Sequence, residues 1–170
     1  MNIPTVTLRA MEPEDLDTLY KIENNHELWG VSATNVPYSR FALHEYVETN
    51  TNDIYTDKQV RMMIDNEAGE TVGIIDLMNF SPQNSRAEVG IVIMKAHRRK
   101  GYAAAALEKL VDYARRTLHL HQLFLVAEYE NASCLRLFER QGFVKTARLG
   151  QWLQVKEGQY KDACLMQLFL

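Results

Sequence analysis

Apolar and polar positions alternate along much of the chain, a pattern typical of β-strands with one buried face. Turn-forming residues at 66–69, 81–84 and 156–158 separate neighbouring runs and favour short connections between them. The pattern predicts seven strands, over residues 6–9, 59–65, 71–79, 86–93, 123–127, 144–155 and 160–170. Strands joined by these short turns are expected to pair antiparallel.

Helical signals fill the remaining segments. Pro13 suits the first turn of a helix, and Ser39 suits the N-cap of another. One apolar stripe at helical spacing follows Gly101, and Gly142 is placed to end a shorter helix. The chain is therefore expected to contain four helices, over residues 13–23, 39–49, 101–118 and 132–141.

One predicted strand differs from the others. Residues 123–127 form a nearly continuous apolar run after the longest helix, as expected of a strand buried on both faces and reached by a crossover. This strand should lie parallel to residues 86–93. We therefore expect one α/β (α+β) domain over residues 1–170, with a mixed, mostly antiparallel sheet of about seven strands, a central parallel pair and about four helices.

A candidate anion site lies between the strand at 86–93 and the long helix. The segment reads Arg98-x-x-Gly101-x-Ala103, and Arg98, Arg99 and Lys100 supply positive charge. Unpaired N–H groups and the helix dipole favour an anion there, and Gly101 permits close approach of the backbone. The segment lacks the P-loop pattern and the three glycines of the dinucleotide fingerprint. Coenzyme A is the remaining candidate; a solvated loop or a nucleic-acid patch is the alternative.

A second motif follows about 30 residues later, with Asn131-Ala132, Phe138 and Gly142-Phe143. Together the two motifs resemble the GNAT superfamily of N-acetyltransferases. The two ends of the chain resemble one branch of this superfamily, which contains spermidine acetyltransferases and ribosomal-protein N-terminal acetyltransferases. The resemblance lies in Leu8-Arg9 and residues 13–16 near the start of the chain, and in residues 158–166 near its end. The resemblance implies a single GNAT domain, a splayed parallel pair of strands and acetyl-CoA as co-substrate.

The resemblance also implies where the cofactor lies. The pantetheine arm should enter between the parallel strands and pair with free backbone groups, as an added strand would. Asn131 could bond the same arm, although it would equally well cap a helix. The expected cofactor-binding residues are Val92, Ile93, Met94, Arg98, Arg99, Lys100, Gly101, Tyr102, Ala103, Ala104, Asn131 and Phe138.

Acetyl transfer requires a neutral amine, whereas an alkyl amine of pKa about 10.4 is mostly protonated at pH 7. A carboxylate that accepts this proton, directly or through water, would lower the barrier. Glu88 on the central strand is the first candidate for this base, unless it pairs with Arg86 instead, and Asp76 is the second. Relatives in this branch carry a tyrosine where this chain has Phe138, so their proton donor to the leaving thiolate is missing.

The acceptor is less defined than the cofactor. Polyamine-binding relatives carry an acidic cluster between their first two helices, whereas residues 29–38 contain no acid. Glu27, Trp29 and Tyr38, with Asp76, are the candidate acceptor residues, and the aromatic pair could equally belong to the core. The expected acceptor is a small amine, a polyamine or a peptide N-terminus. The alternative to an N-acetyltransferase is a catalytically weak acyl-CoA-binding or protein-interaction module.

Bulk properties limit the other possibilities. The formal net charge of −3 disfavours a nucleic-acid partner, and no apolar run is long enough for a membrane span. The start of the chain lacks a signal-peptide pattern, so we expect a cytoplasmic protein. Neither Cys134 and Cys164 nor the five histidines show metal-ligand spacing, so no metal is expected. A homo-oligomer is left open.

Overall fold

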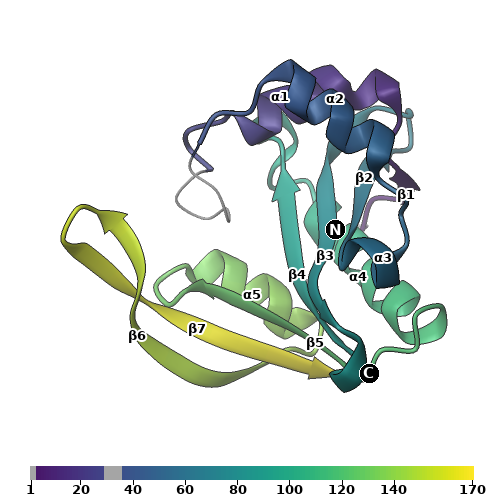
Figure 1. Cartoon of the computed structure of the whole chain (residues 1–170). Coiled ribbons are helices and arrows are strands. Elements are labelled where there is room, and N and C mark those ends of the chain that lie inside the picture. The colour runs from purple at the N-terminus through teal and green to yellow at the C-terminus, as the bar shows by residue number, and fades with distance from the viewer. Residues whose placement is uncertain (1–2, 29–35) are drawn as a thin grey trace.

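The computed structural model describes residues 3–28 and 36–170, which build one seven-stranded sheet (Figure 1). The strands are β1 (Val6–Ala10), β2 (Val60–Asn66), β3 (Thr71–Ser81), β4 (Arg86–Ile93), β5 (Gln122–Glu128), β6 (Val144–Lys156) and β7 (Gln159–Phe169). They lie in the order β1-β2-β3-β4-β5-β7-β6, and every neighbouring pair is antiparallel except β4 with β5. The predicted strand number, mixed pairing and central parallel pair are confirmed.

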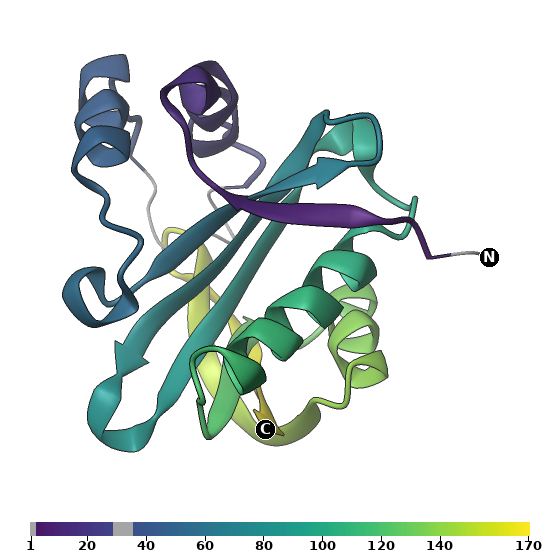
Figure 2. The same cartoon turned by 90° about the vertical axis from the view of Figure 1, so that its right-hand side faces the viewer.

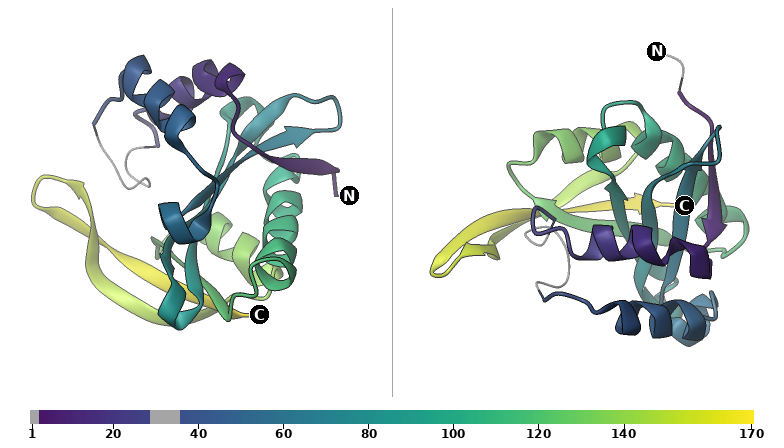
Figure 3. Two further views of the ribbon diagram at one scale, coloured as in Figure 1. Left: turned by 45° about the vertical axis from the view of Figure 1, so that its right-hand side comes forward. Right: turned by 90° about the horizontal axis from the view of Figure 1, so that it is seen from above.

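Helices cover both faces of the sheet. The α-helices are α1 (Leu16–Glu23), α2 (Arg40–Thr49), α3 (Ile54–Asp57), α4 (Tyr102–Arg116) and α5 (Ala132–Arg140). α1 and α2 lie together on one face, and α4 and α5 on the other (Figures 2 and 3). Three short 3-10 turns, Pro13–Asp15, Pro82–Asn84 and Lys95–His97, join strands and helices.

The short helix α3 is a fifth helix that the apolar pattern did not predict. It has only four residues, too few to show helical periodicity. Its N-cap is formed by Asp53, whose side chain accepts a hydrogen bond from the N–H of Tyr55 at 3.0 Å. Ile54 is buried, so the helix closes the edge of the core beside β2.

Alternation along β4 separates two apolar clusters. Ala87 and Val89 are buried in the larger cluster with α4 and α5, which we call the α4–α5 face. Val92 and Met94 pack instead against the smaller cluster under α1, on the α1–α2 face. The side chain of Glu88 therefore belongs to the α1–α2 face. No helix within residues 3–28 and 36–170 is long and apolar enough to cross a membrane.

The parallel strands β4 and β5 lie side by side only where they begin. Three register pairs join them: Arg86 with Gln122, Ala87 with Leu123, and Glu88 with Phe124. Within the described chain, β4 continues to Ile93 and β5 to Glu128 without further pairs. Over the same length β3 pairs with β4 and β7 pairs with β5, so the two halves of the sheet diverge (Figure 1).

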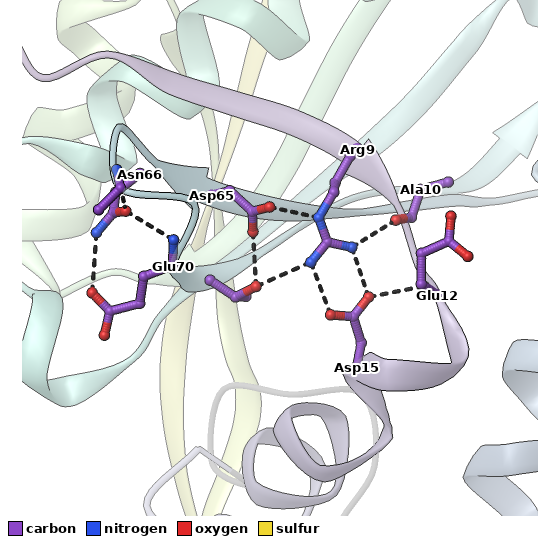
Figure 4. A network of polar contacts seen from close by, with 9 residues as sticks. Arg9, Ala10, Glu12, Asp15, Asp65, Asn66 and Glu70 are labelled. Atoms are coloured by element: carbon purple, nitrogen blue, oxygen red, sulfur yellow. Dashed lines mark hydrogen bonds and ion pairs between the residues drawn. The ribbon is translucent and has the colours of Figure 1, made fainter.

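Arg9 on β1 ties the first helical segment to the sheet (Figure 4). Its Nη1 and Nη2 donate to both carboxylate oxygens of Asp15 at 2.7 and 2.9 Å, and its Nε donates to Asp65 at 2.5 Å. The Glu12 N–H also donates to Asp15, at 2.8 Å, while the Thr71 hydroxyl bridges Arg9 and Asp65. The network places the start of α1 over β2 and β3.

Burial and pairing act in opposite directions on Asp15. Burial alone would raise the pKa of its carboxyl, but hydrogen bonds from Arg9 and Glu12 outweigh burial and hold that pKa below the ordinary value. A carboxyl with a lowered folded-state pKa contributes stability above its unfolded pKa of about 3.9. That contribution is lost as the pH falls through the folded pKa.

We expect Asp15→Asn to lower the free energy of unfolding at pH 7 by about 2 kcal/mol, because it removes the charge from two charge-assisted hydrogen bonds and leaves Arg9 partly unpaired. Urea unfolding at pH 7 and pH 3 measures the effect, and the difference between variant and wild type should shrink at pH 3. Asp17→Asn, at an exposed carboxylate paired with Arg40, is the control and should change little. Equal losses in both variants would contradict a specific role for Asp15.

Candidate active site

The divergence of β4 and β5 leaves one edge of β4 open. The Met94 N–H donates to the Val72 carbonyl at 2.9 Å. The Val92 carbonyl oxygen also faces β3, because a Cβ atom added to Gly73 would lie 2.1 Å from this oxygen. Backbone groups alternate sides along a strand, so those of Ile91 and Ile93 point the other way, into the gap. This edge is suited to an amide-rich arm that binds as an added strand.

This geometry corrects part of the sequence expectation. Both backbone groups of Met94 are engaged, since its carbonyl also accepts from the His97 N–H at 2.8 Å. Val92 turns its carbonyl toward β3. Of the three residues expected to pair with the cofactor arm, Ile93 turns its backbone groups to the gap, as does Ile91, which the sequence argument did not name. Pairing of these groups with the arm remains a prediction.

Arg98 already contacts the open edge. Its Nε donates to the Ile93 carbonyl at 2.9 Å, which satisfies one acceptor in the gap. The remaining guanidinium nitrogens lie beside the loop that precedes α4, and Arg98, Arg99 and Lys100 are all exposed. The three charges are thus next to both the gap and the start of α4.

The first turn of α4 presents unpaired donors next to these charges. The Gly101 carbonyl accepts from the Ala105 N–H at 3.2 Å, so the N–H groups of Tyr102, Ala103 and Ala104 have no partner within the helix. Gly101 has φ +88°, and an added Cβ would lie 2.8 Å from Cδ of Pro4. Glycine is thus required for conformation and for packing against the chain start, in addition to any approach of a ligand.

Contacts outside the motif hold this loop in place. His97 lies 3.5 Å from a carboxylate oxygen of Glu70, in the turn between β2 and β3. Its ring also contacts Tyr102 edge-on, with centroids 6.3 Å apart. Lys95 reaches Glu27 at 3.2 Å, where both side chains are exposed. The basic loop is therefore anchored both to the β2–β3 turn and to the segment after α1.

The second motif forms α5. Asn131 is its N-cap, and its Oδ1 accepts from the Cys134 N–H at 3.2 Å and from the Ser133 hydroxyl at 3.0 Å. Phe138 is 2% exposed, and its ring packs edge-on against Phe143 with centroids 5.1 Å apart. Asn131 thus has a structural role and Phe138 belongs to the core; their contacts with cofactor remain predictions.

Glu88 lies where the two strands begin to diverge, and its side chain is half-buried on the α1–α2 face. Its Oε2 accepts a hydrogen bond from Nδ2 of Asn79 at 2.6 Å. Arg86, which the sequence suggested as a salt-bridge partner, makes no ion pair with Glu88 within the described residues. A neutral amide, and not a cation, therefore holds the proposed base.

Asp76 is engaged more strongly than Glu88. Both of its oxygens accept from Arg61, at 2.8 and 3.0 Å, and Arg61 also pairs with Glu23 of α1. The Arg61 guanidinium lies 5.8 Å from the centre of the Tyr46 ring, and burial raises the pKa of the Tyr46 hydroxyl. Asp76 is thus held by its cation next to Gly90, and both of its oxygens already accept hydrogen bonds.

A second ion cluster lies at the end of β5. Lys161 of β7 pairs with Glu128 and lies 3.5 Å from Glu130. The register pairs Glu128 with Ala163. Side chains alternate along β7, so Ala163 and Lys161 lie on one face of the sheet and the buried Met166 lies on the other. This cluster therefore faces the same side of the sheet as Glu88.

The remaining acceptor candidates lie near the first two helices. Tyr38 is half-buried, and its backbone N–H and carbonyl both bond the side chain of Asn24, at 2.8 and 3.0 Å. Glu27 is exposed beside Lys95. Trp29 lies outside the described residues. The structure thus brings Glu27 close to the basic loop but does not join it to Asp76.

A sheet opened between two parallel strands, beside a basic loop and a helix N-terminus, is the arrangement expected of an acetyltransferase that uses acetyl-CoA. The chain matches the family model for the acetyltransferase (GNAT) domain over residues 5–144, and it belongs to this family. The predicted superfamily, fold, enzyme class and acetyl-CoA co-substrate are confirmed, and the chain is an N-acetyltransferase.

Similar proteins include enzymes from both expected groups. The spermidine N(1)-acetyltransferase of Vibrio cholerae is 27% identical over 163 residues, which cover 96% of this chain and 92% of that protein. The putative ribosomal N-acetyltransferase YdaF of Bacillus subtilis is 30% identical over 164 residues, or 92% of this chain and 87% of that one. The crystal structure of the Vibrio cholerae spermidine N-acetyltransferase with CoA and spermine has a TM-score of 0.87 at 25% identity, covering 97% and 95% of the two chains.

We expect Arg98→Ala to raise the Kd for acetyl-CoA about tenfold, or about 1.4 kcal/mol, because a charge beside the diphosphate is lost. Acetyl-pantetheine, which has no diphosphate, should bind no more weakly, since the Ile93 carbonyl is then free. Titration calorimetry with both ligands measures the difference. Arg115→Ala, an exposed residue near the other end of α4, is the control. Unchanged acetyl-CoA affinity in folded Arg98→Ala would exclude Arg98 from diphosphate binding.

Proposed function

We propose that the chain transfers the acetyl group of acetyl-CoA to a primary amine of a small polycation, with spermidine as the first acceptor to test. The observation that carries this proposal is the charge of the α1–α2 face. Among the ion pairs of the described residues, each cluster there joins one cation to two carboxylates: Arg61 to Glu23 and Asp76, and Lys161 to Glu128 and Glu130. Glu88 adds a further carboxylate. Such a surface attracts a multiply charged cation.

The segment between the first two helices is not the source of this negative charge. Residues 29–38 contain no acid, which by sequence disfavoured a polyamine. The carboxylates that face the opening of the sheet come instead from α1, β3, β4 and the end of β5. The similarity to the spermidine N(1)-acetyltransferase of Vibrio cholerae, whose structure is known with CoA and spermine, supports the same class of acceptor.

Glu88 is the proposed general base. Ile91, whose backbone faces the cofactor gap, lies three positions further along β4, about 10 Å at the usual rise per residue. A proton from an amine near the thioester would thus reach Glu88 through water rather than by direct contact. The carboxylate is half-buried and open to the α1–α2 face, as such a path requires.

Direct attack by the amine in a ternary complex is the proposed route. A covalent acetyl-enzyme would need a thiolate, and burial raises the pKa of both Cys134 and Cys164. The coenzyme A thiol, with an ordinary pKa of about 8.5, can leave as thiolate without a donor. The absence of a hydroxyl at Phe138 is therefore compatible with turnover.

The first test is an acceptor panel. Purified protein with acetyl-CoA should release free thiol fastest with spermidine and spermine, more slowly with monoamines, and least with peptide N-termini. Glu88→Gln should lower kcat/KM for the acceptor by about 10² or more, the usual contribution of a general base, without changing the Kd for acetyl-CoA. Glu130→Gln, on the same face but at its rim, should change mainly KM. A preference for peptides over polyamines would refute the acceptor class.

A second variant tests the leaving-group step. Phe138→Tyr should keep kcat within about tenfold of wild type, because the ring shape is retained and the thiolate leaves unaided. A hydroxyl buried against Phe143 should lower thermal stability slightly. Steady-state rates with saturating acetyl-CoA, together with melting curves, measure both effects. A larger loss of kcat, with cofactor affinity and folding intact, would contradict the proposed independence from a donor at residue 138.

A further inference from the structure

Strand β3 contains one extra residue directly opposite the proposed base. The register runs from Met78 with Glu88 to Ser81 with Arg86, so β3 advances three positions while β4 advances two. The Phe80 N–H leaves the ladder and donates to the Lys58 carbonyl at 3.2 Å. This is a β-bulge, a feature that redirects side chains and occurs often beside active sites.

The bulge has a clear effect on packing. Leu77 and Phe80 are both buried in the α4–α5 cluster, although strict alternation would place them on opposite faces. The extra residue is Asn79, which has φ +49°, in the left-handed region that asparagine tolerates better than most residues. Its side chain is exposed on the opposite, α1–α2 face.

That placement brings the Asn79 carboxamide to Glu88. Nδ2 donates to Oε2 at 2.6 Å, which fixes one carboxylate oxygen and leaves Oε1 to accept other protons. The strand distortion therefore supplies the donor that positions the proposed base.

We infer that Asn79 is a positioning residue that acts through Glu88, and this inference rests on the proposed role of Glu88 as base. Other charged groups near Glu88 are Arg86 on β4 and Asp76 on β3, and Asp76 is paired with Arg61. On β5 the pairing partners, Phe124 and Gln122, are uncharged, and the charged Glu128 lies at the far end of that strand. Asn79 is the group that hydrogen-bonds the Glu88 carboxylate directly.

Two substitutions isolate this contact. Asn79→Gly keeps a residue that adopts positive φ freely but removes the amide donor. Asn79→Asp keeps a residue that tolerates positive φ and replaces the amide donor with a second carboxylate. Ser85→Gly is the matched control, because Ser85 has φ +48° in the same hairpin, and its hydrogen bonds within the described chain involve its backbone N–H and carbonyl, which glycine keeps.

The measurement is the steady-state kcat and KM for spermidine, together with the Kd for acetyl-CoA. At pH 7, kcat should fall about threefold to tenfold in Asn79→Gly and further in Asn79→Asp, because the Glu88 carboxylate loses the donor that positions it. KM and the Kd for acetyl-CoA should stay as in wild type. Ser85→Gly should leave all three constants as in wild type.

A double-mutant cycle separates failure of this inference from failure of the base assignment. With Glu88→Gln already present, Asn79→Gly should have no further effect on kcat/KM. An active Glu88→Gln variant would show that Glu88 is not the general base. If Glu88→Gln is inactive but Asn79→Gly keeps the wild-type kcat, Glu88 is the base and Asn79 does not position it. Melting curves of each variant confirm that the compared proteins are folded.

Discussion

The divergence of β4 and β5 is the constraint on which the rest of this structure depends. Backbone N–H and carbonyl groups need partners, and the end of β4 has lost its neighbour on one side. Arg98 satisfies the Ile93 carbonyl, and the groups left over suit the amides of a pantetheine arm. The strands can separate because β3 and β7 hold them from outside along their full length. The opening is thus built into the sheet.

Much of this arrangement follows from patterns in the sequence. Seven strands and the long helix were predictable because alternation and an apolar stripe persist over many residues. The basic loop was predictable because Gly101 and its neighbouring charges lie between a strand and a helix. Helix α3 was not, since four residues carry no period, and neither was the bulge at Asn79, because one extra residue shifts the register without changing the overall pattern.

Long-range partners are the other part that the sequence could not supply. In the sequence, Arg9 and Asp15 stood out only because they lie in the first segment that resembles the family. The structure shows that Arg9 donates two hydrogen bonds to Asp15. Arg61 was not singled out at all, although it binds Asp76 and Glu23 from two different elements. Such pairs depend on how the sheet and helices are assembled, so a residue's own neighbours in the chain give no sign of them.

The two faces of the sheet have different tasks at the opening. On the α4–α5 face, Phe138 and the residues around it form a buried apolar core. On the α1–α2 face, Glu88 and the two acidic clusters are at least partly exposed. An arm paired to β4 lies in the plane between them. A cationic amine would therefore approach from the acidic face, where the proposed base Glu88 also lies.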